Sequence, residues 1–438
     1  MKGHAKIKEY FGVSFKKVFI MKQSKFNSRI SVTDATDLLY NAYSDRFMLI
    51  RHDAEIPTDE RAANIGEYVK GGFVVTDGAD EVEAVKKMSL AEDLRDDKYM
   101  LIVNPTLGCN FNCWYCYEQK SNSTEMPEET LRRVKRCITY ICTHFKKLDL
   151  SFFGGEPLLK FTDIVRPLID HASKESKAAG CGLSLSFTTN GSLITSSMID
   201  YFEGRDVYFQ ITLDGGRSVH DDTRHFKTGK GSYEIILNNI CRLLKHRHGV
   251  RLRVNYTDKN VDTIADIADD VTEKTQEADR KYLCFSLHQV WQNTSVDLSE
   301  AVGRQKDAIM AKGFQVLLPL FDNVRSSCYG DKKNSMVVNY NGDLYKCTAV
   351  DFMNVKREGY LAEDGRPVWE DDSLNKRLSR KFTNKPCLEC RILPICNGSC
   401  TQKYIYNEGH DFCVFGYSDK KKDEAILRKF ERYIENVK

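Results

Sequence analysis

The chain has 438 residues, of which 41% are hydrophobic and 29% are charged, as is usual for a folded protein of two to four domains. Its net charge of +3 produces no strong field that would favour nucleic acid as a partner. No apolar stretch approaches the roughly 20 residues that a membrane span needs, and residues 1–22 lack the apolar run of a secretory signal.

Fifteen cysteines in a chain without an export signal indicate metal or redox chemistry rather than structural disulfides. We therefore expect the protein to act in the cytoplasm.

Short β-type pieces alternate with polar turns before residue 98. Strand patterns cover residues 29–32, 38–43 and 47–51, and helix patterns cover residues 59–69 and 81–88. No cluster of His, Asp or Glu at ligand spacing occurs there. We expect residues 1–97 to form a small α+β domain without catalytic residues of its own.

From residue 98 the pattern becomes an alternation of strands and helices, which is typical of βα units around a parallel sheet. Clear helix patterns cover residues 128–145, 163–178 and 233–246. Six strands are too few for a closed eight-stranded barrel, so the predicted fold class is α/β, with a partial (β/α)6 TIM-type barrel over residues 98–310. The predicted strands are 99–103, 148–153, 183–188, 207–213, 250–256 and 282–290.

Three cysteines follow the first of these strands: Cys109, Cys113 and Cys116. Iron–sulfur clusters are held by Cys thiolates, and a four-iron cube with every iron bound to protein takes four of them. A loop that offers only three leaves one iron able to chelate a small molecule with an amine and a carboxylate. Parallel barrels carry their chemistry at the C-terminal ends of strands, which is where this loop begins.

The spacing of these cysteines, with the aromatic Tyr115 just before the last one, resembles the cluster loop of the radical SAM superfamily. The resemblance implies one 4Fe–4S cluster that binds S-adenosyl-L-methionine and cleaves it to a 5′-deoxyadenosyl radical. An electron donor such as flavodoxin or ferredoxin would supply the electron. Clusters with an open iron are oxidised easily, so this chemistry predicts a cell that lives with little oxygen.

The segment Gly154-Gly155-Glu156-Pro157 follows the second predicted strand. Paired glycines let a backbone approach a ligand closely, and a glutamate can accept a hydrogen bond from an ammonium group. Taken alone, the segment is also an ordinary turn. One βα unit after the cysteine loop, it is similar to the radical SAM segment that holds the methionyl amine of S-adenosylmethionine.

Polar residues end the next three predicted strands. The resemblance implies that Asn190, Thr212 and Asn255 hold the ribose and carboxylate of the nucleoside, with Arg224 as a further candidate. Turn chemistry and helix capping explain each of them singly about as well. Tyr115 would pack beside the adenine, although a core aromatic gives the same pattern.

Seven cysteines crowd the chain after residue 311. Their spacing resembles the SPASM extension of radical SAM enzymes, which houses two auxiliary 4Fe–4S clusters, and a zinc ribbon of four thiolates is the rival. We assign residues 311–438 to a SPASM domain with a charged C-terminal helix. The cysteines are Cys328, Cys347, Cys387, Cys390, Cys396, Cys400 and Cys413.

The family's interleaved pattern implies two ligand sets, one of which is a ligand short. An open iron, a non-Cys ligand such as Asp322, or Cys284 folding back would each account for the missing ligand. The complete set is Cys387, Cys390, Cys396 and Cys413, and the incomplete set is Cys328, Cys347 and Cys400.

Relatives with a SPASM extension mostly modify peptides or proteins. The anaerobic sulfatase maturases, which oxidise Cys or Ser to formylglycine, begin almost at the cluster loop and place an aspartate directly after the second SPASM cysteine. Here 108 residues precede the loop, and Thr348 follows Cys347. Both departures favour the other large branch, the peptide maturases, which install thioether or carbon–carbon cross-links in ribosomally made precursors (RiPPs).

The predicted function is therefore that of a radical SAM/SPASM oxidoreductase acting on a precursor peptide with a leader sequence, with no nucleic-acid or membrane partner. A sulfatase-maturating enzyme and a non-catalytic, metal-stabilised peptide-binding scaffold are the alternatives. The N-terminal extensions of peptide maturases often resemble a small winged-helix module that binds the leader as an added strand. Residues 31–75, with a hairpin-like stretch at 38–49, are compatible with that role, and a structural lid is the alternative.

Overall fold

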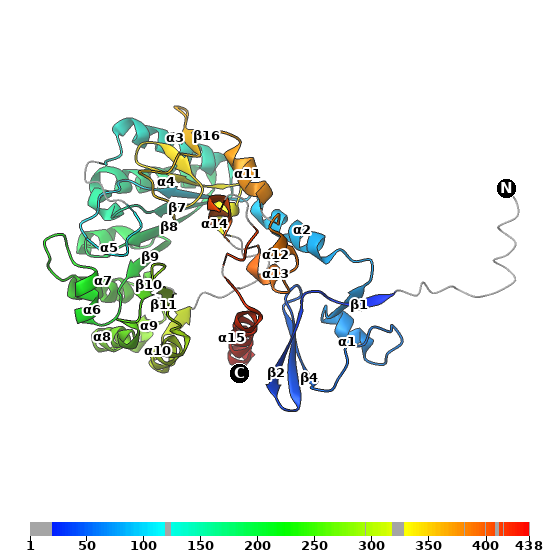
Figure 1. The fold of residues 1–438 in the computed structure, drawn as a ribbon. Coiled ribbons are helices and arrows are strands. Elements are labelled where there is room, and N and C mark those ends of the chain that lie inside the picture. Colours follow the sequence, from blue (N-terminus) through cyan, green and yellow to red (C-terminus); the bar gives the residue numbers. More distant parts are fainter. Residues whose placement is uncertain are drawn as a thin grey trace, which may run out of the picture.

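The structure is a computed structural model that describes residues 20–118, 124–293, 295–317, 328–380, 382–398, 400–407, 411–414 and 416–437. A curved sheet with helices on its outer side forms the larger part of the molecule, and a smaller sheet lies near the N-terminus (Figure 1). Asp322, one of the candidate cluster ligands, lies outside the described residues. None of the described helices has both the length and the apolar character needed to cross a membrane.

A parallel sheet with its strands in chain order confirms the predicted fold class. Each strand from β6 to β11 is hydrogen-bonded to the next, and each lies within one residue of its predicted bounds. The short strand β12 (Gln315–Leu317) continues the series beyond β11. The six predicted strands are β6 (Lys98–Val103), β7 (Lys147–Phe152), β8 (Gly182–Thr189), β9 (Val207–Thr212), β10 (Gly249–Tyr256) and β11 (Leu283–Gln289).

Helices cover the outer face of this sheet because every second strand residue there is apolar. Leu252 and Val254 of β10 and Phe209 of β9 are fully buried in one large core. That core also contains Ile236 and Ile240, which lie one helical turn apart on α7 (Tyr233–Lys245). Side chains alternate between the two faces of a strand, so the intervening polar residues lie on the concave face.

The remaining helices of the barrel lie between its strands or follow the last of them, as βα connectivity requires. They are α3 (Glu128–His144), α4 (Arg166–Ala179), α5 (Ser196–Phe202), α6 (Arg217–Thr223), α8 (Asp266–Lys274), α9 (Glu277–Arg280) and α10 (Ser299–Ala311).

The cysteine-rich C-terminal part continues the sheet at its other edge. Strand β13 (Ser335–Val338) pairs in parallel with β6, so that Val338 lies beside Val103 near the cysteine loop. Strands β14 (Asp343–Tyr345), β15 (Gly359–Leu361) and β16 (Pro367–Trp369) follow in antiparallel order. The part assigned to a SPASM domain is thus joined to the barrel by a backbone ladder.

The N-terminal part contains a three-stranded antiparallel sheet in the order β2-β3-β4. The predicted helix at 59–69 is wrong in its first half, because residues 59–62 form a turn in which the side chain of Asp59 accepts from the backbone N–H of Arg61. The elements are β1 (Met21–Gln23), β2 (Asn27–Thr33), β3 (Thr36–Asn41), β4 (Arg46–Arg51), α1 (Ile65–Lys70), β5 (Val74–Thr76) and α2 (Glu81–Asp93).

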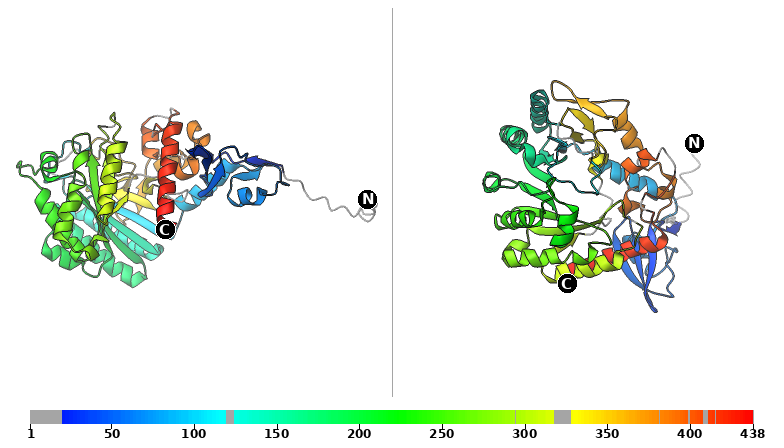
Figure 2. Two further views of the ribbon diagram at one scale, coloured as in Figure 1. Left: turned by 90° about the horizontal axis from the view of Figure 1, so that it is seen from below. Right: turned by 60° about the vertical axis from the view of Figure 1, so that its left-hand side comes forward.

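This small sheet packs against the end of the chain. Figure 2 shows the C-terminal helix α15 (Asp419–Val437) running between the barrel and the small sheet. Phe47 of β4 contacts Phe430 of α15, with ring centroids 5.1 Å apart. Leu38 and Ile426 belong to the same buried apolar cluster. The first and last parts of the chain therefore share one core. The short C-terminal helices are α11 (Ser373–Arg380), α12 (Lys385–Leu388), α13 (Leu393–Cys396) and α14 (Thr401–Tyr406).

We expect Ile426→Ala to loosen this shared core. Ile426 is fully buried, and removing such a side chain costs about 2–5 kcal/mol of unfolding free energy. The variant should melt at a lower temperature and be cleaved faster by protease near residues 93–97. Ile434→Ala is the matched control, because Ile434 is exposed on the same helix; equal melting temperatures for the two variants would contradict the shared core.

Candidate cofactor-binding site

The loop that carries the three predicted cluster cysteines is fastened to two neighbouring loops. Asn190 Nδ2 donates to Asn110 Oδ1 at 2.8 Å, and Asn110 Nδ2 donates to Ser192 Oγ at 3.0 Å. Backbone hydrogen bonds join the same loop to residues 225–227. The loop is therefore held from the ends of two different strands.

The three thiols differ in exposure along this loop. Cys109 is buried, Cys113 is half-buried and Cys116 is exposed. The backbone N–H of Phe111 donates to Cys109 Sγ at 3.4 Å, which orients that sulfur. The trio thus runs from a buried thiol to one at the surface.

The paired glycines bring the second loop into backbone contact with the cysteine loop. A Cβ on Gly155 would lie 2.3 Å from the carbonyl oxygen of Gly108, and Gly154 adopts a φ of +106° that other residues rarely adopt. The close approach allows Glu156 N to donate to Gly108 O at 2.8 Å and Gly155 N to donate to Thr106 O at 3.2 Å. We predicted that these glycines let the backbone approach a ligand closely. In the structure, the backbone that they approach is that of the cysteine loop.

Glu156 is fully buried and links this segment to the end of β8. Its carboxylate accepts from Leu158 N at 2.9 Å, Thr189 Oγ1 at 2.7 Å and Asn190 N at 2.7 Å. Burial raises the pKa of Glu156, and these hydrogen bonds oppose the increase. A carboxylate offers about four acceptor positions, so one remains for the ammonium group that we predicted. Pro157 begins the short turn that follows.

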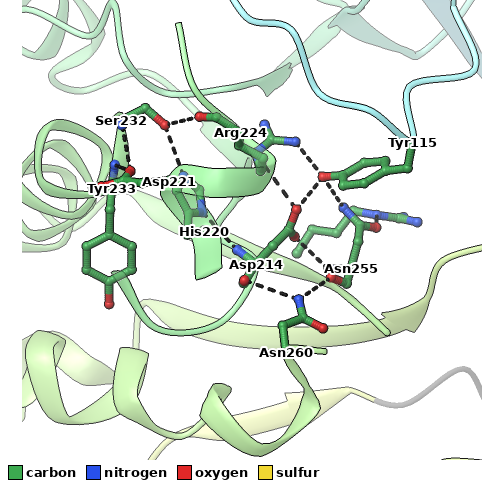
Figure 3. A network of polar contacts seen from close by, with 10 residues as sticks. Tyr115, Asp214, His220, Asp221, Arg224, Ser232, Tyr233, Asn255 and Asn260 are labelled. Atoms are coloured by element: carbon green, nitrogen blue, oxygen red, sulfur yellow. Dashed lines mark hydrogen bonds and ion pairs between the residues drawn. The ribbon is translucent and has the colours of Figure 1, made fainter. Parts of the chain in front are cut away.

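A second buried network contains Tyr115, Asp214, Arg224 and Asn255 (Figure 3). The Tyr115 hydroxyl donates to Asp214 Oδ2 and accepts from Arg224 Nη1 at 2.7 Å and from Asn255 Nδ2 at 3.1 Å. Asn255 N donates to the other oxygen of Asp214 at 2.8 Å. The network joins the cysteine loop to the ends of β9 and β10.

Charge and burial oppose each other in this network. Burial raises the pKa of Asp214 although Arg224 lowers it. Burial alone would lower the pKa of Arg224, but Cys113, Tyr115 and Asp214 outweigh this effect and raise it. Burial also raises the pKa of the Tyr115 hydroxyl. The guanidinium therefore stays charged beside Cys113.

Further polar residues hold Asp214 and Arg224 in place (Figure 3). The backbone N–H of Asp214 donates to Nδ1 of the buried His220 at 3.0 Å, and Nε2 of His220 lies 3.0 Å from Ser232 Oγ. Ser232 in turn donates to the backbone carbonyl of Arg224. Burial lowers the pKa of His220 well below its usual value, so the ring is neutral.

The predicted pocket residues thus come together at the C-terminal ends of the strands. Asn190, Arg224 and Asn255 each bond to the cysteine loop, and Thr212 is buried at the end of β9. Asp214 was not among the candidates, although it follows β9 in the same way that Asn190 follows β8. That positional likeness is the signal that could have identified it.

Some C-terminal cysteines interact electrostatically with others of the same predicted set. Burial is the main cause that raises the pKa of Cys328 to about 12, and Cys347 and Cys400 contribute to the shift. Burial also raises the pKa of Cys387, with contributions from Cys413 and Cys390. The assignment of each set to one cluster stays a prediction.

The described residues include no three Cys, His, Asp or Glu side chains grouped tightly enough to hold a single metal ion. The zinc ribbon of four thiolates stays the alternative prediction for the C-terminal cysteines.

Lys346 holds the chain beside the incomplete set of cysteines. This fully buried residue donates through Nζ to the carbonyl oxygen of Ser335 at 2.6 Å and to Ser335 Oγ at 2.9 Å, and also to the carbonyl of Lys332. Burial lowers the pKa of the Lys346 amine to about 7. These bonds fix the backbone between Cys328 and Cys347.

The donor set of the barrel suits a 4Fe–4S cluster and S-adenosylmethionine. Three thiols lie on one anchored loop. Arg224 Nε is buried without a hydrogen-bond partner among the described residues, and such a donor gains by meeting a carboxylate. The open acceptor position of Glu156 provides the complementary group for an amine.

The comparisons agree with this geometry. Residues 103–271 match the radical SAM superfamily model. That range begins at the end of β6 and includes the cysteine loop, the paired glycines and the Tyr115 network. Residues 103–271 of the chain therefore form a radical SAM domain.

Two relatives of this chain are a cyclopropyl synthase and a sulfatase-maturating enzyme. The radical SAM cyclopropyl synthase TigE of Paramaledivibacter caminithermalis is 25% identical over 40% of this chain and 41% of its own length. The cysteine-type anaerobic sulfatase-maturating enzyme of Clostridium novyi is 23% identical over 69% of this chain and 87% of its own length.

Two solved structures share the fold. The enzyme anSMEcpe with bound AdoMet and the Cp18Cys peptide aligns with a TM-score of 0.58 and 20% identity, covering 78% of this chain and all of its own. Streptococcus suis SuiB bound to its precursor peptide SuiA aligns with a TM-score of 0.55 and 14% identity, covering 90% of this chain and 98% of its own. These alignments confirm the partial-barrel fold.

Glu156→Gln tests the link between the two loops and β8. The substitution places an amide NH2 where a carboxylate oxygen accepts from buried donors, which costs about 1–3 kcal/mol. We expect a lower melting temperature and weaker binding of S-adenosylmethionine in equilibrium dialysis. Glu128→Gln is the control, because that side chain is 81% exposed; if both variants behaved like the wild type, Glu156 would not hold the site together.

Proposed function

We propose that this chain is a radical SAM peptide maturase that modifies a ribosomally made precursor peptide. One observation carries the proposal: Cys109, Cys113 and Cys116 lie on a loop that is bonded to the paired glycines and, through Tyr115, to a buried Asp–Arg pair. The match of residues 103–271 to the radical SAM model supports it independently.

The three cysteines would hold the 4Fe–4S cluster, and Glu156 and Arg224 would bind the amine and the carboxylate of S-adenosylmethionine. When bound, this pair of groups supplies a 5′-deoxyadenosyl radical that can take a hydrogen atom from an unactivated C–H bond. The protein's own contribution is orientation and exclusion of water. The buried network around Asp214 supplies both, because its members are tied to three separate strand ends.

The residue after Cys347 favours cross-linking over sulfatase maturation. Thr348 stands there, its Oγ1 lies 2.6 Å from the Tyr329 hydroxyl, and its backbone N–H donates to that hydroxyl at 2.8 Å. Tyr117 of the cysteine loop reaches the Thr348 carbonyl at 3.2 Å. We expect a sulfatase maturase to have an aspartate here, whose carboxylate acts as the base. The Thr348 hydroxyl is not a carboxylate, and it already bonds to Tyr329. The 23% identity to the Clostridium novyi enzyme keeps that activity as the second candidate.

The auxiliary clusters would accept the electron that the substrate radical must lose. Cys387, Cys390, Cys396 and Cys413 suit one cluster, and Cys328, Cys347 and Cys400 leave the other one ligand short. Cys284 does not lie in that neighbourhood, because it sits in the β11 ladder between Arg251 and Gln315, near the start of the strand. We propose an open iron that binds a substrate group in place of the missing ligand, and Asp322, which lies outside the described residues, stays the alternative.

The N-terminal sheet is the proposed binding site for the leader peptide. Strands β2 and β4 are its edges, and Leu49 on β4 is 58% exposed. An added strand needs only an unpaired edge and neighbouring pockets. Because the same sheet shares a core with α15, a bound leader would be held in a fixed position relative to the cysteine-rich part.

Cys113→Ala tests the radical chemistry. We expect reduced, reconstituted wild-type protein to release 5′-deoxyadenosine from S-adenosylmethionine, and the variant to release none and to contain about four fewer irons. Cys241→Ala is the control, because burial raises the pKa of that thiol to about 11 and it belongs to neither predicted set. Release from the Cys113 variant at the wild-type rate would refute the proposal.

Cys387→Ala tests the auxiliary clusters separately. Wild-type protein should bind about twelve irons and no zinc, and the variant about eight, since each cluster holds four. Uncoupled release of 5′-deoxyadenosine should persist in the variant, because the barrel loop is intact. Stoichiometric zinc in the wild type would favour the metal-stabilised scaffold instead.

A further inference from the structure

Two arginines on the concave face of the sheet have no carboxylate partner in the described part of the chain. Arg251 and Arg253 alternate along β10 with Leu252 and Val254, which are fully buried among the helices. The period of two places both guanidinium groups on the other face, the one away from the helices. Both residues are half-buried.

The contacts of these arginines are few and uncharged. Arg253 Nε donates to Asn255 Oδ1 at 2.8 Å. The Arg251 guanidinium lies 5.5 Å from the ring centroid of Tyr208, and its Nε is buried without a hydrogen-bond partner. A buried donor without an acceptor costs free energy, and a cation out of water costs more unless it is paired.

The neighbouring ladder positions supply no counter-charge. Arg251 lies between Gln210 and Cys284, and Arg253 lies between Thr212 and Ser286. His288, two residues beyond Ser286, keeps its Nε2 at 2.9 Å from the Ser286 hydroxyl. Burial first, then Arg253 and Arg251, lower the pKa of His288 to about 4. Both cations therefore act on this imidazole, and it is neutral at pH 7.

In the described part of the chain, the carboxylate that acts on Arg253 is that of Asp214, and its oxygens already accept hydrogen bonds from other residues. Asp214 favours the charged form of Arg253, yet burial dominates and lowers the pKa of Arg253. The two oxygens of Asp214 accept from Tyr115 and from the backbone of Asn255, and Arg224 is its ion-pair partner at 4.0 Å. Among the described residues, the wall formed by β10 and β11 thus carries two arginines without an ion-pair partner of their own.

We infer that Arg251 and Arg253 bind a carboxylate of the peptide substrate, an inference that rests on the proposed function. Guanidinium groups bind carboxylates through two parallel hydrogen bonds. Arg253 borders the proposed nucleoside pocket, because it lies beside Thr212 and bonds to Asn255. Arg251 lies two residues further from the strand end, about 6.6 Å along the strand. An acidic group held between them would place its neighbouring backbone at the reaction centre.

The carboxylate of S-adenosylmethionine is the other possible source of the same chemistry, and it must be distinguished. The structure favours the peptide, because Arg251 lies deeper than the predicted nucleoside ligands, all of which stand at or beyond the strand ends. Arg224, which bonds to Tyr115 and has an Nε without a hydrogen bond among the described residues, is the arginine that we propose for the nucleoside carboxylate.

The test uses the reconstituted full chain saturated with S-adenosylmethionine. Three alanine pentapeptides serve as probes: one with a central aspartate and one with a central asparagine, both capped at the two ends, and one without aspartate that is capped only at its N-terminus and keeps a free C-terminal carboxylate. Calorimetric titration should show the aspartate peptide binding about tenfold or more tightly than the asparagine peptide, as expected for a charge-assisted pair. Binding of the third peptide would assign the site to a terminal carboxylate instead of a side chain.

The double variant Arg251→Gln/Arg253→Gln should abolish this preference. Arg251→Gln alone, which keeps the hydrogen bond from Arg253 to Asn255, should weaken the preference while its affinity for S-adenosylmethionine stays within about twofold of the wild type. Arg251→Lys/Arg253→Lys should restore part of the preference, because charge remains without the paired geometry. Arg304→Gln, on the outer surface at 59% exposure, is the control and should keep the full preference.

Three results would overturn the inference: equal binding of all three peptides by the wild type, a preference that survives in the double variant, or a loss of affinity for S-adenosylmethionine as large as the loss of preference. The last result would show that both arginines bind S-adenosylmethionine and not the peptide. Failure of the proposed function is recognised separately, because the wild type would then release no 5′-deoxyadenosine.

Discussion

The whole site depends on the close contact between two backbones, at Gly155 on one side and at residues 106–108 on the other. Any side chain at Gly155 would collide with carbonyl oxygens of the cysteine loop. Once the two loops touch, Glu156 reaches the end of β8, and Asn190 at that end bonds back to Asn110 of the cysteine loop. The hydrogen bonds thus form a closed ring through three loops, and the ring fixes the thiol trio before any ligand binds.

Parallel strand order explains how distant residues reach this ring. Six consecutive strands bring their C-terminal ends to one edge, so that residues separated by up to 140 positions, such as Tyr115 and Asn255, share a hydrogen bond. Side chains alternate between the two faces of each strand. The apolar ones pack against the helices, and the polar ones lie on the concave face. The same alternation leaves Arg251 and Arg253 on that side. The predicted cofactor-binding edge and the wall that we propose for substrate are therefore two consequences of one sheet geometry.

The barrel was predictable from sequence because its signals are local and repeated. Apolar residues alternate along the strands, and the predicted bounds agree within one residue. The spacing of Cys109, Cys113 and Cys116 is likewise a local signal, and the cofactor loop that it predicts stays a prediction. The helix expected at 59–69 was wrong in its first half, because the Asp59 side chain accepts a hydrogen bond from the backbone N–H of Arg61 and holds residues 59–62 in a turn.

Long-range partnerships were not predictable from the sequence alone. The sequence near Gly155 does not indicate that the carbonyl oxygen of Gly108 will lie against it. Likewise, Asp214 joins the network through a hydrogen bond with Tyr115, which is 99 residues away in the sequence. The pairing of β13 with β6 joins segments more than 230 residues apart. The contact between the N-terminal sheet and α15 was not predictable either. Neither element contains a sequence motif that indicates which other element it packs against.

The central claim is that the thiol trio leaves one iron free for the amine and carboxylate of S-adenosylmethionine. Electron–nuclear double resonance on the reduced protein, with S-adenosylmethionine labelled with 15N at the amine and 17O at the carboxylate, tests it most directly. The account predicts hyperfine coupling of both labels to the cluster, present in the Cys387→Ala variant and absent in Cys113→Ala. A cluster that forms with all four irons bound by protein and shows no coupling to either label would contradict it.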